Sequence, residues 1–247
     1  GGLRYLIPVI QAAHELGYYV ITCDYLPHNI AHKYADEYHN ISITDKNAVL
    51  KLARELKVDG VMSFAVDPGV LTAAYVCEEL GLPGSPHASI QILQNKDLFR
   101  SFLEKNGFNT PKSHGYHCLN EALSDIKSFQ WPVIVKPVDS AGSKGVTRVD
   151  KIINLEEAIT CALKNSLSHR FIIEEFIEQQ GCSSDSDAFS INGELKFISF
   201  SDQHFDNKAA NPYTPSAYSW PSSMPCNKQE ELASEIQRLR SEEHTSE

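Results

Sequence analysis

The residues of this sequence best suited to chemistry are a lysine that ends an apolar strand and the glycine-rich loop that follows it. Lys136 comes directly after the apolar run 133–135. The loop after it is rich in glycine, serine and lysine: Ser140, Ala141, Gly142, Ser143, Lys144 and Gly145. Glycine allows backbone conformations in which several N–H groups point at one anion. The stretch therefore predicts a phosphate-binding hairpin, and an ordinary glycine-rich turn is the open alternative.

This loop differs from the P-loop found in many nucleotide-binding proteins. The pattern GxxxxGK[ST] does not occur in the sequence, and residues 146–149 after the loop have the composition of a strand. In a P-loop a helix would follow instead. If the loop binds phosphate, it does so at the tip of a β-hairpin.

Two further stretches place charged side chains at positions where they could bind a ligand. Lys96 falls in the first turn of a predicted helix, where a cation is unfavourable unless an anion lies beside it. A solvent-exposed lysine is the alternative. Glu174 and Glu175 follow an apolar strand within the run 170–178, and solvated acids at a strand end are the alternative there.

Composition excludes several classes of protein. The 247 residues carry a formal net charge of -10, which argues against a nucleic-acid surface, since that would need a basic stripe. No run of about 18 apolar residues is present, so no membrane span is expected. The six cysteines are scattered without a CxxC pair. That pattern favours reduced thiols and a cytoplasmic location over a disulfide framework or a zinc site.

The first part of the chain alternates between predicted helices and strands. Helices are expected at 3–16, 45–56 and 67–80, and strands at 19–23, 41–43 and 60–64. This alternation predicts an α/β domain with a parallel sheet and helices on both of its faces. Gly1 and Gly2 followed by Asp24 match a dinucleotide-binding motif only faintly. Asp24 is better explained as a polar residue at a strand end or as a contact to a polar substrate.

A break at 83–86, rich in proline and glycine, separates this part from the rest. Beyond it, helices are expected at 95–106, 120–129, 154–163 and 228–239, and strands at 133–135, 146–149 and 170–178. Asn154 and Glu157 predict a capping box. Asn192 and Gly193 predict a hairpin over 189–197. An irregular stretch is expected at 202–223.

The order of Lys96, then Lys136 with its loop, then the acidic run at 172–177 resembles the ATP-grasp superfamily. Within it, the chain is most similar to carboxylate–amine ligases of the carbamoyl-phosphate-synthase type. The resemblance implies an α/β fold: a preATP-grasp domain with a Rossmann-like parallel sheet at 1–93, lacking its first strand, and then an ATP-grasp domain at 94–239. The ATP-grasp domain would comprise an α+β lid at about 111–176 and an incomplete C-terminal subdomain. Residues 240–247 resemble an adapter-derived artefact.

The resemblance also implies roles for individual residues in binding ATP. Lys96 and Lys136 would contact the phosphates, and Glu174 would lie near the adenine amino group. The loop that closes over the phosphates would comprise Ser140, Ala141, Gly142, Ser143, Lys144, Gly145 and Val146. The nucleotide-binding run continues with Glu175, and then with Phe176 and Ile177, whose backbone groups would face adenine. Gly181 occupies the place of the usual ribose-binding acid, for which Glu178, Asp185 and Asp187 are open alternatives.

The activity that the resemblance implies is ATP-dependent ligation, in which a carboxylate becomes an acylphosphate that an amine or similar nucleophile attacks. ATP and Mg²⁺ would be required, with the magnesium ligands beyond residue 239, so this fragment is expected to be inactive alone. The partners would be small carboxylate and amine substrates, with homo-oligomerisation left open and no catalytic side chain assigned. His204 and Asn211 are candidates for substrate contact, and ordinary loop residues are the open alternative for both. A non-catalytic nucleotide-binding module and an ATP-grasp kinase are the alternatives.

Overall fold

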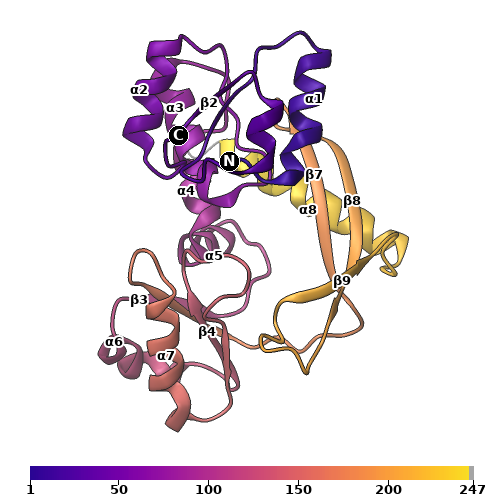
Figure 1. The fold of residues 1–247 in the computed structure, drawn as a ribbon. Coiled ribbons are helices and arrows are strands. Elements are labelled where there is room, and N and C mark those ends of the chain that lie inside the picture. The colour runs from indigo at the N-terminus through magenta and orange to yellow at the C-terminus, as the bar shows by residue number, and fades with distance from the viewer. Residues whose placement is uncertain (245–247) are drawn as a thin grey trace. The chain divides into compact units, whose positions relative to one another are not determined.

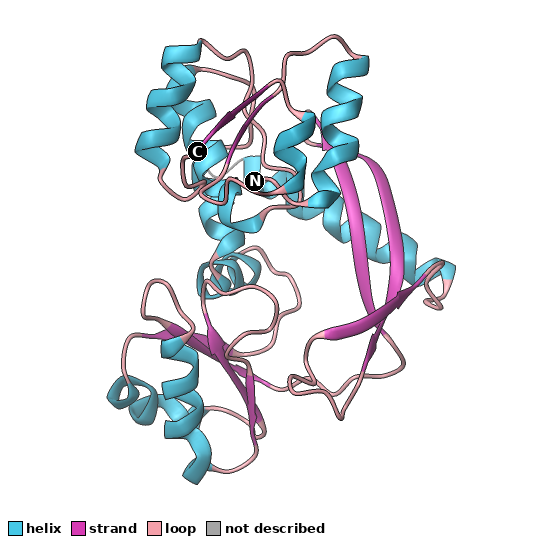
Figure 2. Ribbon diagram, in the orientation of Figure 1, coloured by secondary structure: helices cyan, strands magenta, loops and turns pink. Residues whose placement is uncertain are grey.

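The computed structural model describes residues 1–244, with side chains through residue 241 (Figures 1 and 2). The chain divides into two compact units, Gly1–Gln94 and Asn95–Glu247. The predicted artefact tail at 240–247 falls mostly within the last helix, which ends at His244. Residues 245–247 of that tail lie outside the described part of the chain.

The first unit consists of short helices around one pair of parallel strands. Its elements are η1 (Arg4–Leu6), α1 (Ile7–Glu15), β1 (Ile21–Cys23), η2 (Ile30–Tyr34), β2 (Glu37–His39), α2 (Lys46–Leu56), α3 (Asp67–Leu80) and α4 (His87–Gln94). α2 begins where Asp45 accepts a hydrogen bond from the N–H of Ala48 at 3.0 Å. α3 ends at Gly81, whose φ of 64° only glycine adopts easily. The three helices predicted for this unit are confirmed.

Two of the strands predicted for this unit are wrong. Residues 41–43 are not part of a strand in the described structure. The strand that pairs with β1 is β2, which ends at His39, and Ile41 packs on the apolar cluster of α2 and α3. In the described structure, residues 60–64 are not part of a strand either. Val61 packs on the same cluster, but Met62 and Phe64 are more than half exposed. α4 is an element that the sequence patterns do not predict.

The second unit contains two antiparallel sheets, of strand order β3-β6-β4-β5 and β7-β8-β9 (Figure 2). The elements are α5 (Lys96–Lys105), β3 (Ser113–Tyr116), α6 (Leu119–Asp125), η3 (Ile126–Ser128), β4 (Val133–Pro137), β5 (Thr147–Val149), η4 (Ile152–Asn154), α7 (Leu155–Lys164), β6 (Phe171–Glu175), β7 (Ser183–Ile191), β8 (Glu194–Phe205), β9 (Pro215–Ser219) and α8 (Cys226–His244).

β4 and β6 divide their residues between the two faces of the four-stranded sheet. On one face, Val133 and Val135 are fully buried in the core that α6 and α7 complete. Successive residues of a strand point to opposite faces, so Lys136 lies on the other face. Glu174 of β6 shares that face, because the register pairs it with Ile134. The fold thus places a lysine and a glutamate side by side, away from the core.

The prediction for the second unit differs from the structure in several places, and β7 and β8 extend beyond the predicted hairpin at 189–197. β3 and β9 are not predicted, and β9 lies within the stretch 202–223 that was expected to be irregular. The capping box at Asn154 is wrong: this residue closes the 3-10 turn η4, and its side chain makes no capping hydrogen bond. The hairpin turn is confirmed, with φ of 51° at Asn192 and 76° at Gly193.

Two expectations from composition can be compared with the described residues. No helix among them combines the length and the apolar character that crossing a membrane requires. All six cysteines are free thiols in the structure, and Cys77 is buried.

Candidate nucleotide-binding site

Glu174 is a buried carboxylate held between two cations. Its exposed fraction is 5%. The Nζ atom of Lys136 lies 2.5 Å from Oε2, and the Nε atom of Arg100 lies 2.8 Å from Oε1. Burial alone would raise the pKa of Glu174, but Lys136 and Arg100 together hold it below its usual value. The carboxylate is therefore ionised at neutral pH, and both of its oxygens are occupied.

Helix α5 supplies two cations to this site. Lys96 and Arg100 lie on one face of the helix, because residues four apart are neighbours there. The backbone N–H of Lys96 donates to the carbonyl of Val138 at 2.9 Å, and its Nζ donates to the carbonyl of Ser140 at 2.7 Å. Burial, followed by the charge of Lys136, lowers the pKa of Lys96. A partly buried lysine next to a second lysine favours an anion beside both, so the alternative of a solvent-exposed lysine does not fit.

The position of α5 over the sheet depends on a glycine in β3. A Cβ atom added at Gly115 would lie 2.8 Å from the Cβ of Asp97. Asp97 is itself buried and forms an ion pair with Arg170, just before β6. These contacts hold the first turn of α5 close to the sheet, and with it Lys96 and Arg100.

Asp139 anchors the base of the glycine-rich loop. Its carboxylate accepts hydrogen bonds from the hydroxyl of Ser166 at 2.9 Å, from the N–H of Leu167 at 3.1 Å and from the N–H of Ser168 at 2.7 Å. Burial would raise the pKa of Asp139, but these hydrogen bonds lower it overall. The loop therefore starts from a fixed point between β4 and the segment that joins α7 to β6.

The tip of the loop has the backbone conformation that the sequence predicts. Three residues of the loop have a positive φ: the neighbours Gly142 and Ser143, and Gly145. The hydroxyl of Ser143 donates to the carbonyl of Tyr213 at 2.8 Å, and Nδ2 of Asn211 donates to the carbonyl of Ser143 at 2.9 Å. Asn211, which is predicted as a substrate contact, thus forms a hydrogen bond with the glycine-rich loop. A φ above zero at Ser143 costs conformational energy that these two bonds offset.

The remaining predicted loop residues differ in their surroundings. Ala141 and Lys144 are exposed, so Lys144 is accessible to a ligand. Val146 is partly buried, and its N–H donates to the carbonyl of Ser143 at 3.4 Å. The carbonyl of Ser140 is the one that Lys96 binds.

The run after β6 is held at the edge of the sheet. Glu175 accepts a hydrogen bond from the N–H of Gln130 at 2.8 Å. The N–H of Phe176 donates to the carbonyl of Pro132 at 3.0 Å, so this N–H is already bonded within the protein. The guanidinium of Arg148 lies 4.4 Å from the centroid of the Phe176 ring. Ile177 is exposed, so its side chain is available to an apolar ligand.

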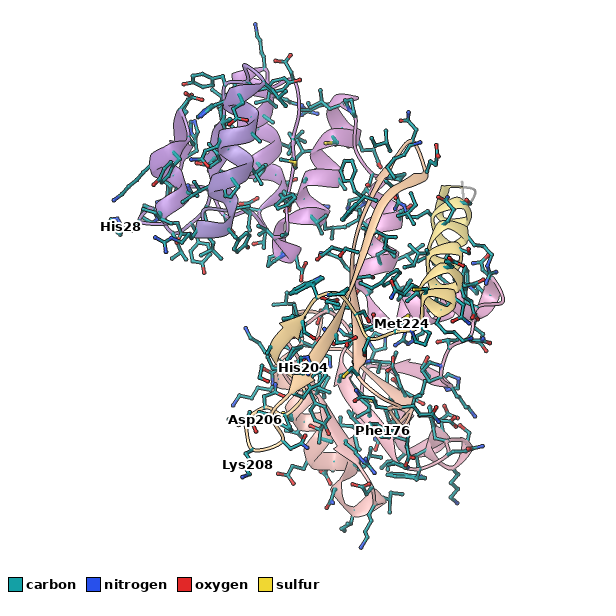
Figure 3. The ribbon with its side chains drawn as sticks, turned by 90° about the vertical axis from the view of Figure 1, so that its right-hand side faces the viewer. His28, Phe176, His204, Asp206, Lys208 and Met224 are labelled. Carbon is teal, nitrogen blue, oxygen red and sulfur yellow. The ribbon has the colours of Figure 1, made fainter. Side chains whose placement is uncertain are left out.

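Figure 3 labels Phe176, His204, Asp206 and Lys208 on the second unit. His204, predicted as a substrate contact, lies near the end of β8, where its Nε2 is 2.8 Å from the hydroxyl of Ser219 in β9. That contact gives His204 a structural role between two strands. The alternatives for a ribose-binding acid remain open: Asp185 is partly buried, and Glu178 and Asp187 are exposed.

Two residues of the site are absent from the sequence-based prediction, namely Arg100 and Asp139. Arg100 carries a usable signal, since it follows Lys96 by one helical turn. Asp139 carries a weaker one, as the acid directly before the loop. In the described part of the chain, no group of three or more His, Cys, Asp or Glu side chains could hold a metal ion. The cations gathered around Glu174 and the loop, Lys96, Lys136 and Arg100, suit an anionic ligand such as a phosphate.

Known proteins similar to this chain share this architecture. Residues 10–84 match the ATP-grasp N-terminal domain family, and residues 93–241 match the ATP-grasp domain family. A formate-dependent phosphoribosylglycinamide formyltransferase of Synechococcus sp. (strain WH7803) is 31% identical over 173 residues, which cover 68% of this chain and 44% of that protein. The carbamoyl phosphate synthase large chain of Pseudothermotoga lettingae is 25% identical over 176 residues, covering 70% of this chain and 16% of that protein.

A solved structure extends the similarity to almost the whole chain. The L-amino acid ligase from Bacillus licheniformis is 26% identical with a TM-score of 0.76, over 98% of this chain and 59% of the ligase. The chain belongs to the ATP-grasp family, and the predicted α/β fold with a preATP-grasp and an ATP-grasp part is confirmed. It spans less than half the length of the formyltransferase that it matches.

Proposed function

We propose that this chain forms the nucleotide-binding part of an ATP-dependent ligase that activates a carboxylate and joins it to an amine or a similar nucleophile. The observation that carries the proposal is the arrangement of Lys96 and Lys136 at the base of the glycine-rich loop. Two adjacent ammonium groups, together with hydroxyl and N–H groups of the loop, are the kinds of donor that a triphosphate needs. The predicted adenine contacts at Glu174, Glu175, Phe176 and Ile177 remain part of this proposal.

The relatives support a carboxylate as the activated group. One is named for its dependence on formate and another for the ligation of L-amino acids. We infer that the substrates are small molecules, that the protein acts in the cytoplasm, and that Mg²⁺ accompanies ATP.

The reaction consists of two displacements. A carboxylate oxygen attacks the γ-phosphorus of ATP, the bond to the β,γ-bridging oxygen breaks, and ADP leaves. The amine nitrogen then attacks the acyl carbon, phosphate leaves with the electron pair of the C–O bond, and the nitrogen loses a proton. In such phosphoryl transfers the protein contributes mainly orientation and positive charge. Lys96, Lys136 and the loop at 140–146 would supply both.

The test is nucleotide binding by the Lys136→Met variant, measured by titration with a fluorescent mant derivative of ATP. Loss of one charge-assisted contact predicts binding weaker by about tenfold or more. Lys151→Met is the matched control, because Lys151 is an exposed lysine at the start of η4. Circular dichroism verifies that the variants fold. Equal affinity of Lys136→Met and the unaltered chain would show that the site is assigned wrongly.

Turnover by the complete protein separates the ligase from its alternatives. ADP release that requires both an acid and an amine supports a ligase. A stable phosphorylated acid that forms without an amine indicates a kinase. Nucleotide binding without turnover on any acid indicates a binding module.

A further inference from the structure

Arg100 is the residue of the site for which neither the sequence patterns nor the proposed chemistry provides a role. It lies on α5, one turn after Lys96, and its side chain is mostly buried. Its Nε atom donates to Oε1 of Glu174 at 2.8 Å. Arg100 therefore reaches the same carboxylate that Lys136 binds, from a helix instead of a strand.

The carboxylate of Glu174 competes with any phosphate for the ammonium group of Lys136. An ammonium group at 2.5 Å from a buried carboxylate is held by that charge, and a phosphate has to compete for it. If Lys136 turned toward a phosphate and nothing else neutralised Glu174, a buried charge would be left unpaired at a cost of several kcal/mol. A second cation on the other oxygen removes this conflict.

The charged groups around Glu174 leave Arg100 as the residue suited to this task. Lys96 donates to the carbonyls of Val138 and Ser140, and Arg148, on the same face of the sheet, is exposed and paired with Asp150. Arg100 and Lys136 are the cations that hydrogen-bond Glu174.

We propose that Arg100 is a positioning residue of the nucleotide site, which holds Glu174 so that Lys136 can bind a nucleotide phosphate. This inference rests on the proposed function, because it needs a phosphate for Lys136. Arg100 acts through Glu174 and has no contact with the reacting atoms in this role. Its positive charge is what matters, so lysine should replace it better than a neutral side chain.

The test measures the affinity of Arg100→Met and of Arg100→Lys for mant-ATP at several pH values between 5.5 and 8. Each affinity is divided by that of the unaltered chain at the same pH. A ratio cancels the titration of the nucleotide itself. At pH 8 we expect Arg100→Met to bind about tenfold more weakly, because Glu174 then retains Lys136. With one cation lost, burial raises the pKa of Glu174, so protonation at low pH releases Lys136 and the deficit shrinks. Arg100→Lys should stay close to the unaltered chain at every pH.

The controls separate this inference from the proposed function. Arg54→Met removes an exposed arginine that is paired with Glu79 in the first unit, and it should not change the affinity. If Arg100→Met does not fold, Arg100→Gln serves in its place, since it removes the charge but keeps a hydrogen-bond donor.

The outcomes are distinct. A deficit of equal size at all pH values, or no deficit, would overturn the role of Arg100 while the Lys136→Met result still stands. Failure of the unaltered chain to bind mant-ATP would instead overturn the proposed function.

Discussion

Gly115 is a residue at which one methyl group should alter the site. An added Cβ would lie 2.8 Å from both Cβ and Oδ2 of Asp97, a buried residue whose partner Arg170 restricts its movement. We expect Gly115→Ala to destabilise the second unit by about 1–3 kcal/mol, because a well-packed contact is overfilled. Urea unfolding measures the change. Gly60→Ala is the control, since a Cβ there meets nothing within 4 Å, and similar stability of both variants would contradict the prediction.

Asp125 should contribute stability that depends on pH. Its Oδ2 accepts a hydrogen bond from the hydroxyl of Tyr116 at 2.7 Å and also contacts Nδ1 of His114, and its Oδ1 accepts one from the hydroxyl of Ser128. Tyr116, followed by His114, lowers the pKa of Asp125 from 3.8 to about 2. Because the folded pKa is depressed, this stability is present above about pH 4 and is lost as the pH falls toward 2.

The variant Asp125→Asn checks this expectation. At pH 7 it should be less stable by about 1 kcal/mol, since the neutral amide replaces a carboxylate in a partly exposed network. Its stability should approach that of the unaltered chain as the pH falls from 4 to 2. Thermal unfolding at pH 7, 4 and 3 measures this. A difference that stays constant over the whole range would show that the charge of Asp125 is not responsible.

The residues of the site differ in how well the sequence alone predicts them. Lys96 and Lys136 could be identified because each occupies a position that local structure marks: a helix start and a strand end. Arg100 follows Lys96 by one helical turn, but its pairing with Glu174 could not be predicted, because an arginine within an amphipathic helix usually faces solvent. Its partner Glu174 is 74 residues away along the chain, and only the folded sheet brings the two together.

At the scale of elements, the segment that joins α7 to β6 supports the base of the glycine-rich loop. Asp139 accepts three hydrogen bonds from residues 166–168. We expect Asp139→Ala to reduce the stability of the second unit by about 1–3 kcal/mol, because three donors lose a charged acceptor. The N–H groups of Leu167 and Ser168 should exchange hydrogen faster, which mass spectrometry detects. Asp150→Ala is the matched control, since this acid is exposed, and unchanged exchange in Asp139→Ala would contradict the role of Asp139.

Elements with strong local signals could be predicted, and those that depend on a distant partner could not. The helices α2 and α3 carry a capping aspartate and a terminal glycine, so their bounds follow from the sequence. β3 has the sequence SHGY, without β-branched residues, and exists because it pairs with β6. Residues 41–43, with two isoleucines, have the composition of a strand, but β2 at Glu37–His39 occupies the place beside β1.

At the scale of the whole molecule, each unit has an apolar core of its own. The cores of the first unit are built around Val49 and Ile10, and the core of the second around Val135. The residues of the proposed nucleotide site all fall within 96–177, and hence within the second unit. A bound nucleotide should therefore stabilise the second unit directly.

Hydrogen exchange with and without ATP examines this expectation across the chain. A ligand at 100 times its dissociation constant stabilises the folded state by about 2.7 kcal/mol. Protection should increase in peptides that contain Lys96, the loop at 140–146 and Glu174, because these groups would contact the nucleotide. The Lys136→Met variant should show much less protection at the same ATP concentration. An increase confined to residues 10–84 would place the nucleotide in the first unit and contradict the assignment of the site.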